Sequence, residues 1–194
     1  MLLPSRGHVS KRREGSRRVS DLLIRDARPS DQDALRELTL AAYQEYAAQI
    51  PAHWEAYRQN ILATLADPTP AGQIVAEHAR TLVGTVLLYP AGTTVSAREG
   101  ASVRRQWPEV RLLAVAPAAR GGGIGAALMQ ECVRRTGASG NAVLTLHTTE
   151  MMRVARHLYE RMGFVRAPDL DFHPAPGLTI RGYRLDLERS TGNS

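Results

Sequence analysis

The stretch from Val110 to Gly125 reads VRLLAVAPAARGGGIG and carries the clearest fold signal in the chain. Its first part, Val110–Val115, is a short apolar run of the kind that forms a buried β-strand. Pro117 has no N–H to donate, so regular strand pairing should end there. Four glycines then lead into a segment with helical spacing of apolar residues: Gly121, Gly122, Gly123 and Gly125. This arrangement predicts a strand, a glycine-rich turn and a helix.

A glycine-rich turn at the start of a helix is suited to binding an anion. Glycine lets the backbone approach a ligand closely, the first N–H groups of a helix have no partner within it, and the helix dipole adds partial positive charge there. Arg120 adds a full charge and a fork of donors. We therefore expect a phosphate or pyrophosphate to bind here. The glycine spacing fits neither the dinucleotide fingerprint G-x-G-x-x-G nor the Gly-Lys-Ser/Thr ending of a P-loop.

The pattern R-x-x-G-x-G, which follows the apolar strand, strongly resembles the acetyl-CoA-binding motif of the GNAT superfamily of N-acetyltransferases. The resemblance implies that the loop amides hold the CoA pyrophosphate. The cofactor-binding residues of this loop would be Arg120, Gly121, Gly122, Gly123, Ile124 and Gly125.

The resemblance also implies how the strand before the loop is used. In this superfamily the strand is bulged and splays from the next parallel strand, and the pantetheine arm of CoA lies in the gap. By this resemblance, the backbone of Leu113 and Val115 should bind pantetheine. The Val115 N–H would also face the thioester carbonyl and stabilise the oxyanion, a role worth a few kcal/mol when the donor is preorganised.

A second segment, Ala155–Phe164, resembles the pattern A-x-x-L-Y-x-x-x-G-F of the same superfamily. The resemblance implies that the Tyr159 hydroxyl lies near the CoA sulfur and protonates the leaving thiolate, a role that suits a phenol because its pKa is close to that of a thiol. Family members often carry a CoA-binding Asn at the position of Met152, so that contact should be missing or replaced. Helical spacing predicts a buried face made of Met151, Val154, Leu158 and Met162.

Direct attack by an amine requires a group that removes its proton. Glu109, at the start of the strand, is the first candidate, because many relatives use a glutamate near that place through a water molecule. The neighbouring Trp107 and Pro108 should lower the local polarity and raise the Glu109 pKa toward a useful value. His147, at the end of the next predicted strand, is the alternative, since its ordinary pKa of about 6.5 suits the task.

By the same resemblance, the acceptor site should be formed by the first two helices and the last hairpin. The first two helices carry ring side chains at Tyr43, Tyr46, His53, Trp54 and Tyr57. The loop 167–177 contains Asp169 and Asp171, which could attract a cationic amine or simply be solvated. These residues do not choose between a small amine, an antibiotic, a peptide and a protein as the acceptor.

The rest of the pattern predicts a mixed α/β (α+β) domain. Strands are expected at 22–24, 73–78, 82–89, 110–115, 142–148, 164–165 and 178–187. Helices are expected after the turn at 29–31, at 51–66 with Pro51 as first residue, at 122–136 and at 151–162, whereas 90–107 reads as a loop. With the resemblance, this order implies a GNAT-like central mixed, mostly antiparallel sheet of about six to seven strands with about four helices, splayed at the cofactor site.

Composition restricts the other possibilities. The 194 residues suit one domain, and most of the net charge of +6 lies in residues 1–20, which hold six basic residues and one acid. We expect 1–20 to be a disordered basic arm, 21–190 to be the GNAT domain and 191–194 to be a tail. Because residues 21–194 are nearly neutral, nucleic acid is not an expected partner. No apolar run is long enough for a membrane span, and the single cysteine, Cys132, reads as a core residue and favours a cytoplasmic location.

Together these patterns predict an enzyme that moves an acetyl group from acetyl-CoA to an unidentified primary amine by direct attack in a ternary complex. No metal site is expected, because the histidines and carboxylates lack ligand spacing. The alternative is a non-catalytic CoA-binding regulatory module that contacts nucleic acid through the basic arm. Retention of Tyr159 and of the Val115 strand favours catalysis. A homodimer is left open.

Overall fold

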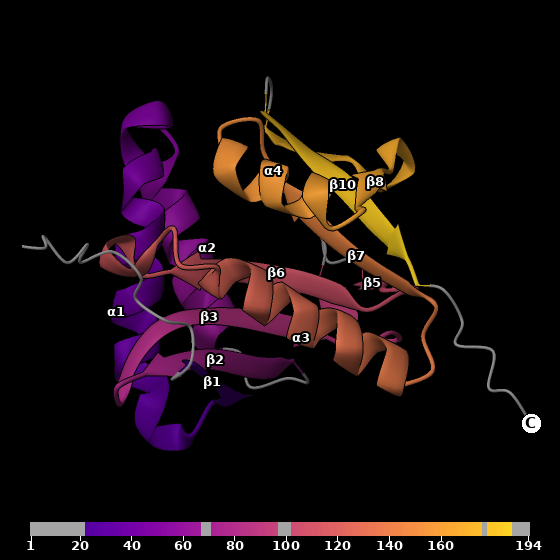
Figure 1. The fold of residues 1–194 in the computed structure, drawn as a ribbon. Coiled ribbons are helices and arrows are strands. Elements are labelled where there is room, and N and C mark those ends of the chain that lie inside the picture. Colours follow the sequence, from indigo (N-terminus) through magenta and orange to yellow (C-terminus); the bar gives the residue numbers. More distant parts are fainter. Residues whose placement is uncertain (1–21, 67–70, 97–101, 176–177, 188–194) are drawn as a thin grey trace, which may run out of the picture.

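The computed structural model of the protein describes residues 22–66, 71–96, 102–175 and 178–187 (Figure 1). The predicted arm at 1–20 and the predicted tail at 191–194 lie outside these ranges. Within the described part of the chain, no helix is long and apolar enough to cross a membrane.

An eight-stranded mixed sheet forms the centre of the fold, with strands in the order β1-β2-β3-β6-β7-β10-β8 and β9 paired to β10. Every pair is antiparallel except β6 with β7. The predicted fold class is confirmed, and β9 adds one strand because the segment before β10 folds back on it as a hairpin. The strands are β1 Leu22–Asp26, β2 Gly72–His78, β3 Thr81–Tyr89, β6 Glu109–Val115, β7 Val143–Thr148, β8 Val165–Arg166, β9 Phe172–Ala175 and β10 Leu178–Asp186.

The described residues include four α-helices that cover the sheet, α1 and α2 on one face and α3 on the other, with α4 beside β7 and β10 (Figure 1). Their bounds are α1 Gln32–Tyr43, α2 Trp54–Ala66, α3 Ile124–Ala138 and α4 Arg153–Arg161. The core is correspondingly divided. One apolar cluster lies between the sheet and α3, and a second lies between the sheet, α1 and α2.

Three local expectations are corrected. Residues 51–53 form turns, so α2 begins at Trp54 and Pro51 is not its first residue. The helix expected from Gly122 begins at Ile124, because Gly123 adopts the left-handed conformation and caps it. Within the expected loop at 90–107, a two-stranded hairpin forms from β4 Thr94–Ser96 and β5 Ser102–Arg104. Strands of three residues are too short to give a reliable period-two pattern.

The position of α3 depends on one glycine of the sheet. A Cβ at Gly84 in β3 would lie 2.9 Å from Ile124 Cγ2 and 3.0 Å from Leu128 Cδ1. A larger residue would push the first turns of α3 away from the strand. Gly84 therefore holds the start of α3 close to the sheet.

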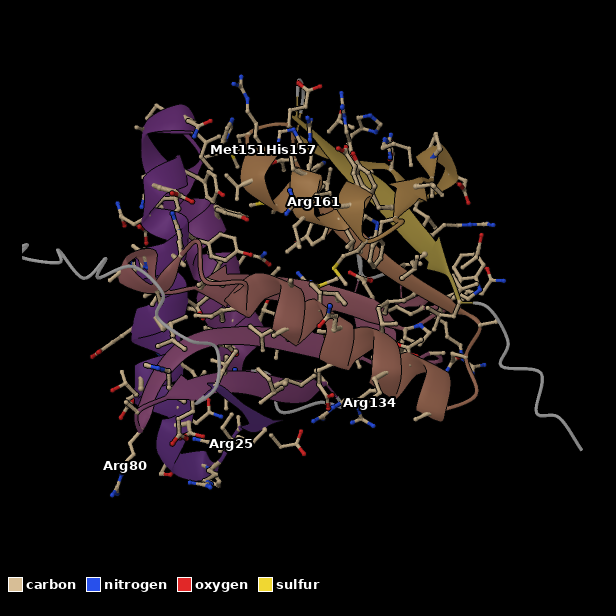
Figure 2. All side chains as sticks on the ribbon, in the orientation of Figure 1. Arg25, Arg80, Arg134, Met151, His157 and Arg161 are labelled. Carbon is tan, nitrogen blue, oxygen red and sulfur yellow. The ribbon has the colours of Figure 1, made fainter. Side chains whose placement is uncertain are left out.

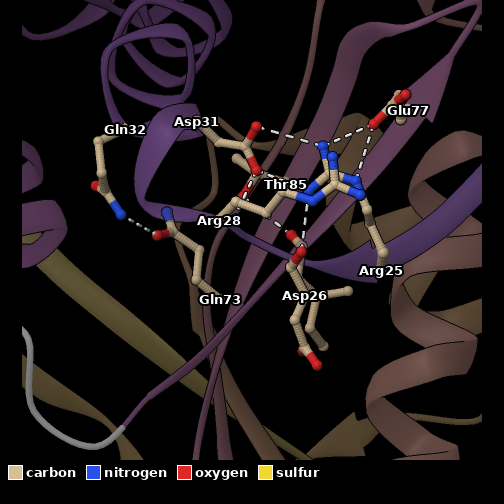
Figure 3. A network of polar contacts seen from close by, with 9 residues as sticks. Arg25, Asp26, Arg28, Asp31, Gln32, Gln73, Glu77 and Thr85 are labelled. Atoms are coloured by element: carbon tan, nitrogen blue, oxygen red, sulfur yellow. Dashed lines mark hydrogen bonds and ion pairs between the residues drawn. The ribbon is translucent and has the colours of Figure 1, made fainter.

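At the β1 edge of the sheet, the Arg25 side chain connects the strands to the start of α1 (Figure 3). Its guanidinium donates to Asp31 at 2.7 Å and to Glu77 at 2.6 Å. Asp31 immediately precedes α1 and Glu77 lies in β2, so the contacts join β1, β2 and the start of α1. These partners raise the pKa of Arg25 and lower that of Asp31, which keeps both groups charged.

Candidate active site

Strands β6 and β7 are paired at one end and separate at the other. Glu109 lies opposite Thr145 and Val110 opposite Leu146, and the Thr145 N–H donates to the Pro108 carbonyl at 2.9 Å. For the two strands, which are described in full, no pairing continues beyond Val110. The splay between parallel strands expected from the resemblance is therefore confirmed.

A bulge in β6 lies where the gap opens. Leu112 has a φ of +49°, and the register with β3 shifts at this point. The left-handed region is strained for a branched residue, and an extra residue moves the following side chains to the other face. As a result, Val110, Leu113 and Val115 all contact the core on the α3 side, whereas Leu112 and Ala114 contact the core on the α1 side.

The backbone beyond the bulge has groups directed toward the gap. The Ala116 N–H donates to the Val83 carbonyl at 2.9 Å, across to β3. Adjacent residues of a strand direct their N–H groups to opposite sides, so the Val115 N–H is directed toward the gap. On the same border, the Tyr43 hydroxyl donates to the Leu113 carbonyl at 3.4 Å.

The turn after β6 presents an open stretch of backbone. Gly121 and Gly123 have φ values of +80° and +78°, and apart from the chain neighbours no heavy atom of the described residues lies within 4 Å of the place a Cβ would occupy at either residue. Gly123 caps α3 without any side-chain hydrogen bond, and the first turn of α3 contains no acid. The first amides of this 15-residue helix are therefore available to an anion.

The other glycines and Ile124 have different surroundings. A Cβ at Gly125 would lie 3.4 Å from Leu158 Cδ2 and 3.7 Å from Val115 Cγ2, so this glycine allows α3 to pack closely against α4 and β6. Gly122 approaches only the Ala119 carbonyl, at 3.6 Å from its would-be Cβ. Ile124 is a core side chain, and only its backbone could contact a ligand.

Arg120 is engaged with the first half of the chain. Its Nη1 donates to Glu45 Oε2 at 2.6 Å and its Nη2 donates to the Ala42 carbonyl at 3.1 Å. Glu45 belongs to η3, the 3-10 segment Gln44–Gln49 that follows α1. The predicted phosphate-binding arginine thus connects the glycine turn to the end of α1.

Tyr159 lies on the buried face of α4. It is 6 % exposed, and its ring centroid is 6.0 Å from that of Phe164. Burial raises the pKa of its phenol, so the hydroxyl keeps its proton at neutral pH. No described residue forms a hydrogen bond with this hydroxyl. A buried phenol of this kind can donate to a ligand.

The expected buried face of α4 is wrong in one residue. Val154 is 82 % exposed. Met152, for which the sequence predicted only the loss of a CoA contact, is buried against residues of α1 and α2. The helix is rotated relative to the prediction because Tyr159 and Met152 define its inner side. Val154 lies one turn before Leu158, on the flank that approaches Gly125. Farther round, His157 and Arg161 lie on the outer surface of the helix (Figure 2).

Glu109 lies at the closed end of the two strands in a buried ion network. The carboxylate is reached by Arg105 Nε at 2.6 Å and by His147 Nδ1 at 3.3 Å. His147 Nε2 contacts the Leu170 carbonyl at 2.9 Å, and its ring is 5.3 Å from that of Phe172. The two predicted proton acceptors therefore contact each other, and both His147 nitrogens face oxygen acceptors.

The expected direction of the Glu109 pKa is wrong. Burial raises it, but hydrogen bonds and charges of His147 and Arg105 outweigh burial and lower the pKa to about 2. Trp107 and Pro108 indicated an apolar environment, but no local pattern indicated that Arg105 and His147 converge on the carboxylate. Glu109 is therefore ionised throughout the neutral range.

Two adjoining hollows of about 290 and 230 Å³ lie between η3 and the connection from β7 to α4. Gln49 and Met151 line both. Thr149, at the end of β7, lines the larger hollow; it is 6 % exposed, and its hydroxyl has no partner in the described residues. Glu150 and Arg181 also line the larger hollow and form an ion pair with each other. The hollow therefore combines a buried hydroxyl with a neutralised pair of charges.

The residues expected around the acceptor are partly brought together. Tyr43 has its ring centroid 6.1 Å from that of Tyr46 and 6.0 Å from that of Tyr57, and the Trp54 ring is 6.2 Å from Tyr57. Asp171 is not free to attract an amine, because Arg166 contacts it at 2.8 Å and the Gly182 N–H donates to it at 2.8 Å.

Sequence reasoning missed Glu45, Arg105 and Thr149. Glu45 and Arg105 lie in segments read as a helix end and a loop, and only the tertiary contacts identify them. The position of Thr149 just after a predicted strand was the one available signal. Within the described residues, no group of three His, Cys, Asp or Glu side chains is placed to hold a metal ion.

The solved structures that share this fold include GNAT acetyltransferases of low sequence identity. A GNAT-family acetyltransferase of Brucella melitensis in complex with acetyl-CoA has a TM-score of 0.53 and 24% identity, covering 85% of this chain and 87% of that one. The PaiA N-acetyltransferase of Thermoplasma acidophilum in complex with coenzyme A has a TM-score of 0.63 and 15% identity, covering 85% and 98%. A putative GNAT acetyltransferase of Desulfovibrio desulfuricans has a TM-score of 0.58 and 20% identity, covering 85% and 98%. These likenesses show the fold.

Sequence comparison identifies the family. No curated protein matches the chain significantly. The model of the acetyltransferase (GNAT) family matches residues 33–164, about two thirds of the chain, and this span includes the splayed strands, the glycine turn and Tyr159. The chain belongs to the GNAT acetyltransferase family.

Proposed function

We propose that this protein transfers the acetyl group of acetyl-CoA to a primary amine. Three features of the structure support the proposal: the separated ends of β6 and β7, the open glycine turn, and the Tyr159 hydroxyl, which has no hydrogen-bond partner among the described residues. Two of the structural neighbours, from Brucella melitensis and Thermoplasma acidophilum, are complexes with acetyl-CoA and coenzyme A.

The residues around the gap fit such a co-substrate. The amides from Gly121 to Gly125 and the Arg120 guanidinium would hold the pyrophosphate. The backbone of Leu113 and Val115 would bind the pantetheine amides as a neighbouring strand does. Val154, exposed on the flank of α4 that approaches the turn, would pack against the pantetheine chain. Such a ligand would cover the exposed Val154 side chain and the backbone donors of the glycine turn.

The proposed reaction is a direct transfer. The amine nitrogen attacks the thioester carbon, a C–N bond forms and the C–S bond breaks, giving an N-acetyl amide and CoA. The Val115 N–H would donate to the carbonyl oxygen as negative charge develops on it. The Tyr159 hydroxyl would give its proton to the leaving sulfur. Positioning both groups in a preformed gap supplies the main part of the catalysis.

Proton removal from the amine would use the Glu109–His147 pair. With a pKa lowered to about 2, Glu109 is a weak base by itself. We propose that it orients His147, and that the pair receives the proton through water. Glu109 is then a positioning residue, and loss of its carboxylate should change the pH profile of the rate.

A calorimetric titration of the purified chain tests the proposal, with acetyl-CoA as ligand and NAD and ATP as controls. Selective binding of acetyl-CoA, followed by thiol release in the presence of a primary amine from a panel of amino acids, polyamines and peptides, is the expected outcome. Failure of a folded sample to bind acetyl-CoA would remove the assignment. Binding without thiol release with any amine would leave the non-catalytic CoA-binding module as the better reading.

A further inference from the structure

One arginine is shared between the proposed cofactor turn and the α1–η3 segment. Arg120 donates to Glu45 Oε2 at 2.6 Å and to the Ala42 carbonyl at 3.1 Å. Ala42 lies in the last turn of α1, where the helix carbonyls carry partial negative charge. Both partners of the guanidinium therefore belong to the protein, although the space around the would-be Cβ atoms of the adjacent Gly121 and Gly123 is free of other described residues.

Glu45 also borders the place where the co-substrate would lie. It lines the smaller hollow together with Val154, the exposed valine on the α4 flank. The pKa of Tyr46, which lines the same hollow, is raised to about 12 by burial and by the Glu45 charge. A carboxylate here would face a ligand that carries several phosphate charges, and like charges repel.

We propose that Glu45 competes with the phosphates of acetyl-CoA for Arg120 and thereby weakens binding of the co-substrate and of the product CoA. The inference rests on the proposed function. When phosphate binds, the guanidinium exchanges its carboxylate partner for the pyrophosphate, and Glu45 is left facing negative charge. The side chains of Arg120 and Glu45 are 40% and 42% exposed, so the ion pair is weak enough to exchange. The consequence is faster release of CoA after transfer, a step that often limits turnover.

Calorimetric titration of four variants with acetyl-CoA and with CoA tests the competition. Glu45→Gln should tighten both ligands by about two- to fivefold, the range expected for a partly exposed ion pair. Glu37→Gln is the matched control, because Glu37 is an exposed acid on α1 and its loss changes the net charge equally. In the background of Arg120→Gln, the Glu45→Gln change should have little effect, since the contested group is gone.

The remaining outcomes overturn the inference in distinct ways. Weaker binding by Glu45→Gln would mean that Glu45 orients Arg120 for phosphate. Equal tightening with and without Arg120 would mean simple repulsion. Unchanged affinity would mean that Arg120 is a structural link between α1 and the turn. If the folded wild-type chain binds no acetyl-CoA in the same titration, the proposed function falls and this inference with it.

Discussion

The two ends of strand β6 lie in opposite environments. At its start, Glu109 is paired to neighbouring strands on both sides, and its carboxylate is held by Arg105 and His147. Beyond the Leu112 bulge, the strand loses its parallel neighbour, and Val115 leads into a turn of open glycines. At the closed end the polar side chains bind one another. At the open end, beyond Leu112, backbone and hydroxyl groups remain that could bind a ligand. The difference indicates that the co-substrate would bind at the open end, whereas the closed end supplies stability and the proposed proton acceptor.

The largest expected effect is at the open end. Gly123→Glu should abolish acetyl-CoA binding, because the new side chain would place a carboxylate among the amides proposed to hold phosphate. Gly140→Glu is the control: Gly140 has a φ of +77° and open space around it, so the strain and the charge change are matched. The measurement is calorimetric titration of both variants. Equal affinities in the two variants would place the phosphate site elsewhere.

A second change separates chemistry from binding. Tyr159→Phe should lower kcat by about a hundredfold, because the leaving thiolate loses its proton donor. The dissociation constant of acetyl-CoA should hardly change, since the ring still packs against Phe164. Steady-state kinetics and titration check this, with Tyr183→Phe, another core tyrosine, as control. A fully active Tyr159→Phe enzyme would remove the tyrosine from the mechanism.

The closed end should respond in stability. Glu109→Gln should lower the free energy of unfolding at pH 7 by about 3 kcal/mol, because it leaves the buried Arg105 guanidinium without its carboxylate. The folded pKa of about 2 lies below the ordinary 4.5, so the carboxylate stabilises the fold above pH 4.5 and loses this effect as the pH falls toward 2. Urea unfolding of wild type and variant at several pH values should show that the difference between their free energies of unfolding becomes smaller as the pH falls from 4.5 toward 2. A difference that does not change with pH would contradict the ion network.

The smallest effect concerns the α4 flank. Val154→Ser should weaken acetyl-CoA binding by about threefold through loss of apolar contact. The melting temperature should stay unchanged, because Val154 is 82 % exposed in the free protein. Titration and thermal unfolding measure the two quantities, and Val165→Ser, 55 % exposed on β8, is the control. Equal acetyl-CoA affinity in both variants would show that the pantetheine does not cover this flank.

Features that depend on local chemistry could be predicted from the sequence. The apolar strand, the glycine turn and the helix after it could be read from Val110–Gly125, because backbone in the left-handed conformation favours glycine at particular positions of the turn. The family followed from the spacing of the two motifs, and the family model confirms it. Tyr159, Val115 and the turn residues stay predictions as site residues.

The pairing of the charged groups depends on tertiary contacts. The Glu109 pKa was expected to rise and is lowered, since Arg105 and His147 reach the carboxylate from a loop and from another strand. Arg120, which stays a predicted phosphate ligand, contacts Glu45, 75 residues earlier, a partner that the local sequence did not indicate. The rotation of α4 that exposes Val154 likewise depends on the α1 and α2 residues against which Met152 packs. The periodicity of apolar residues predicts helices and strands because it follows the backbone geometry. The pairing of charges and the rotation of a helix depend on residues that are distant in the chain, so a local pattern does not predict them.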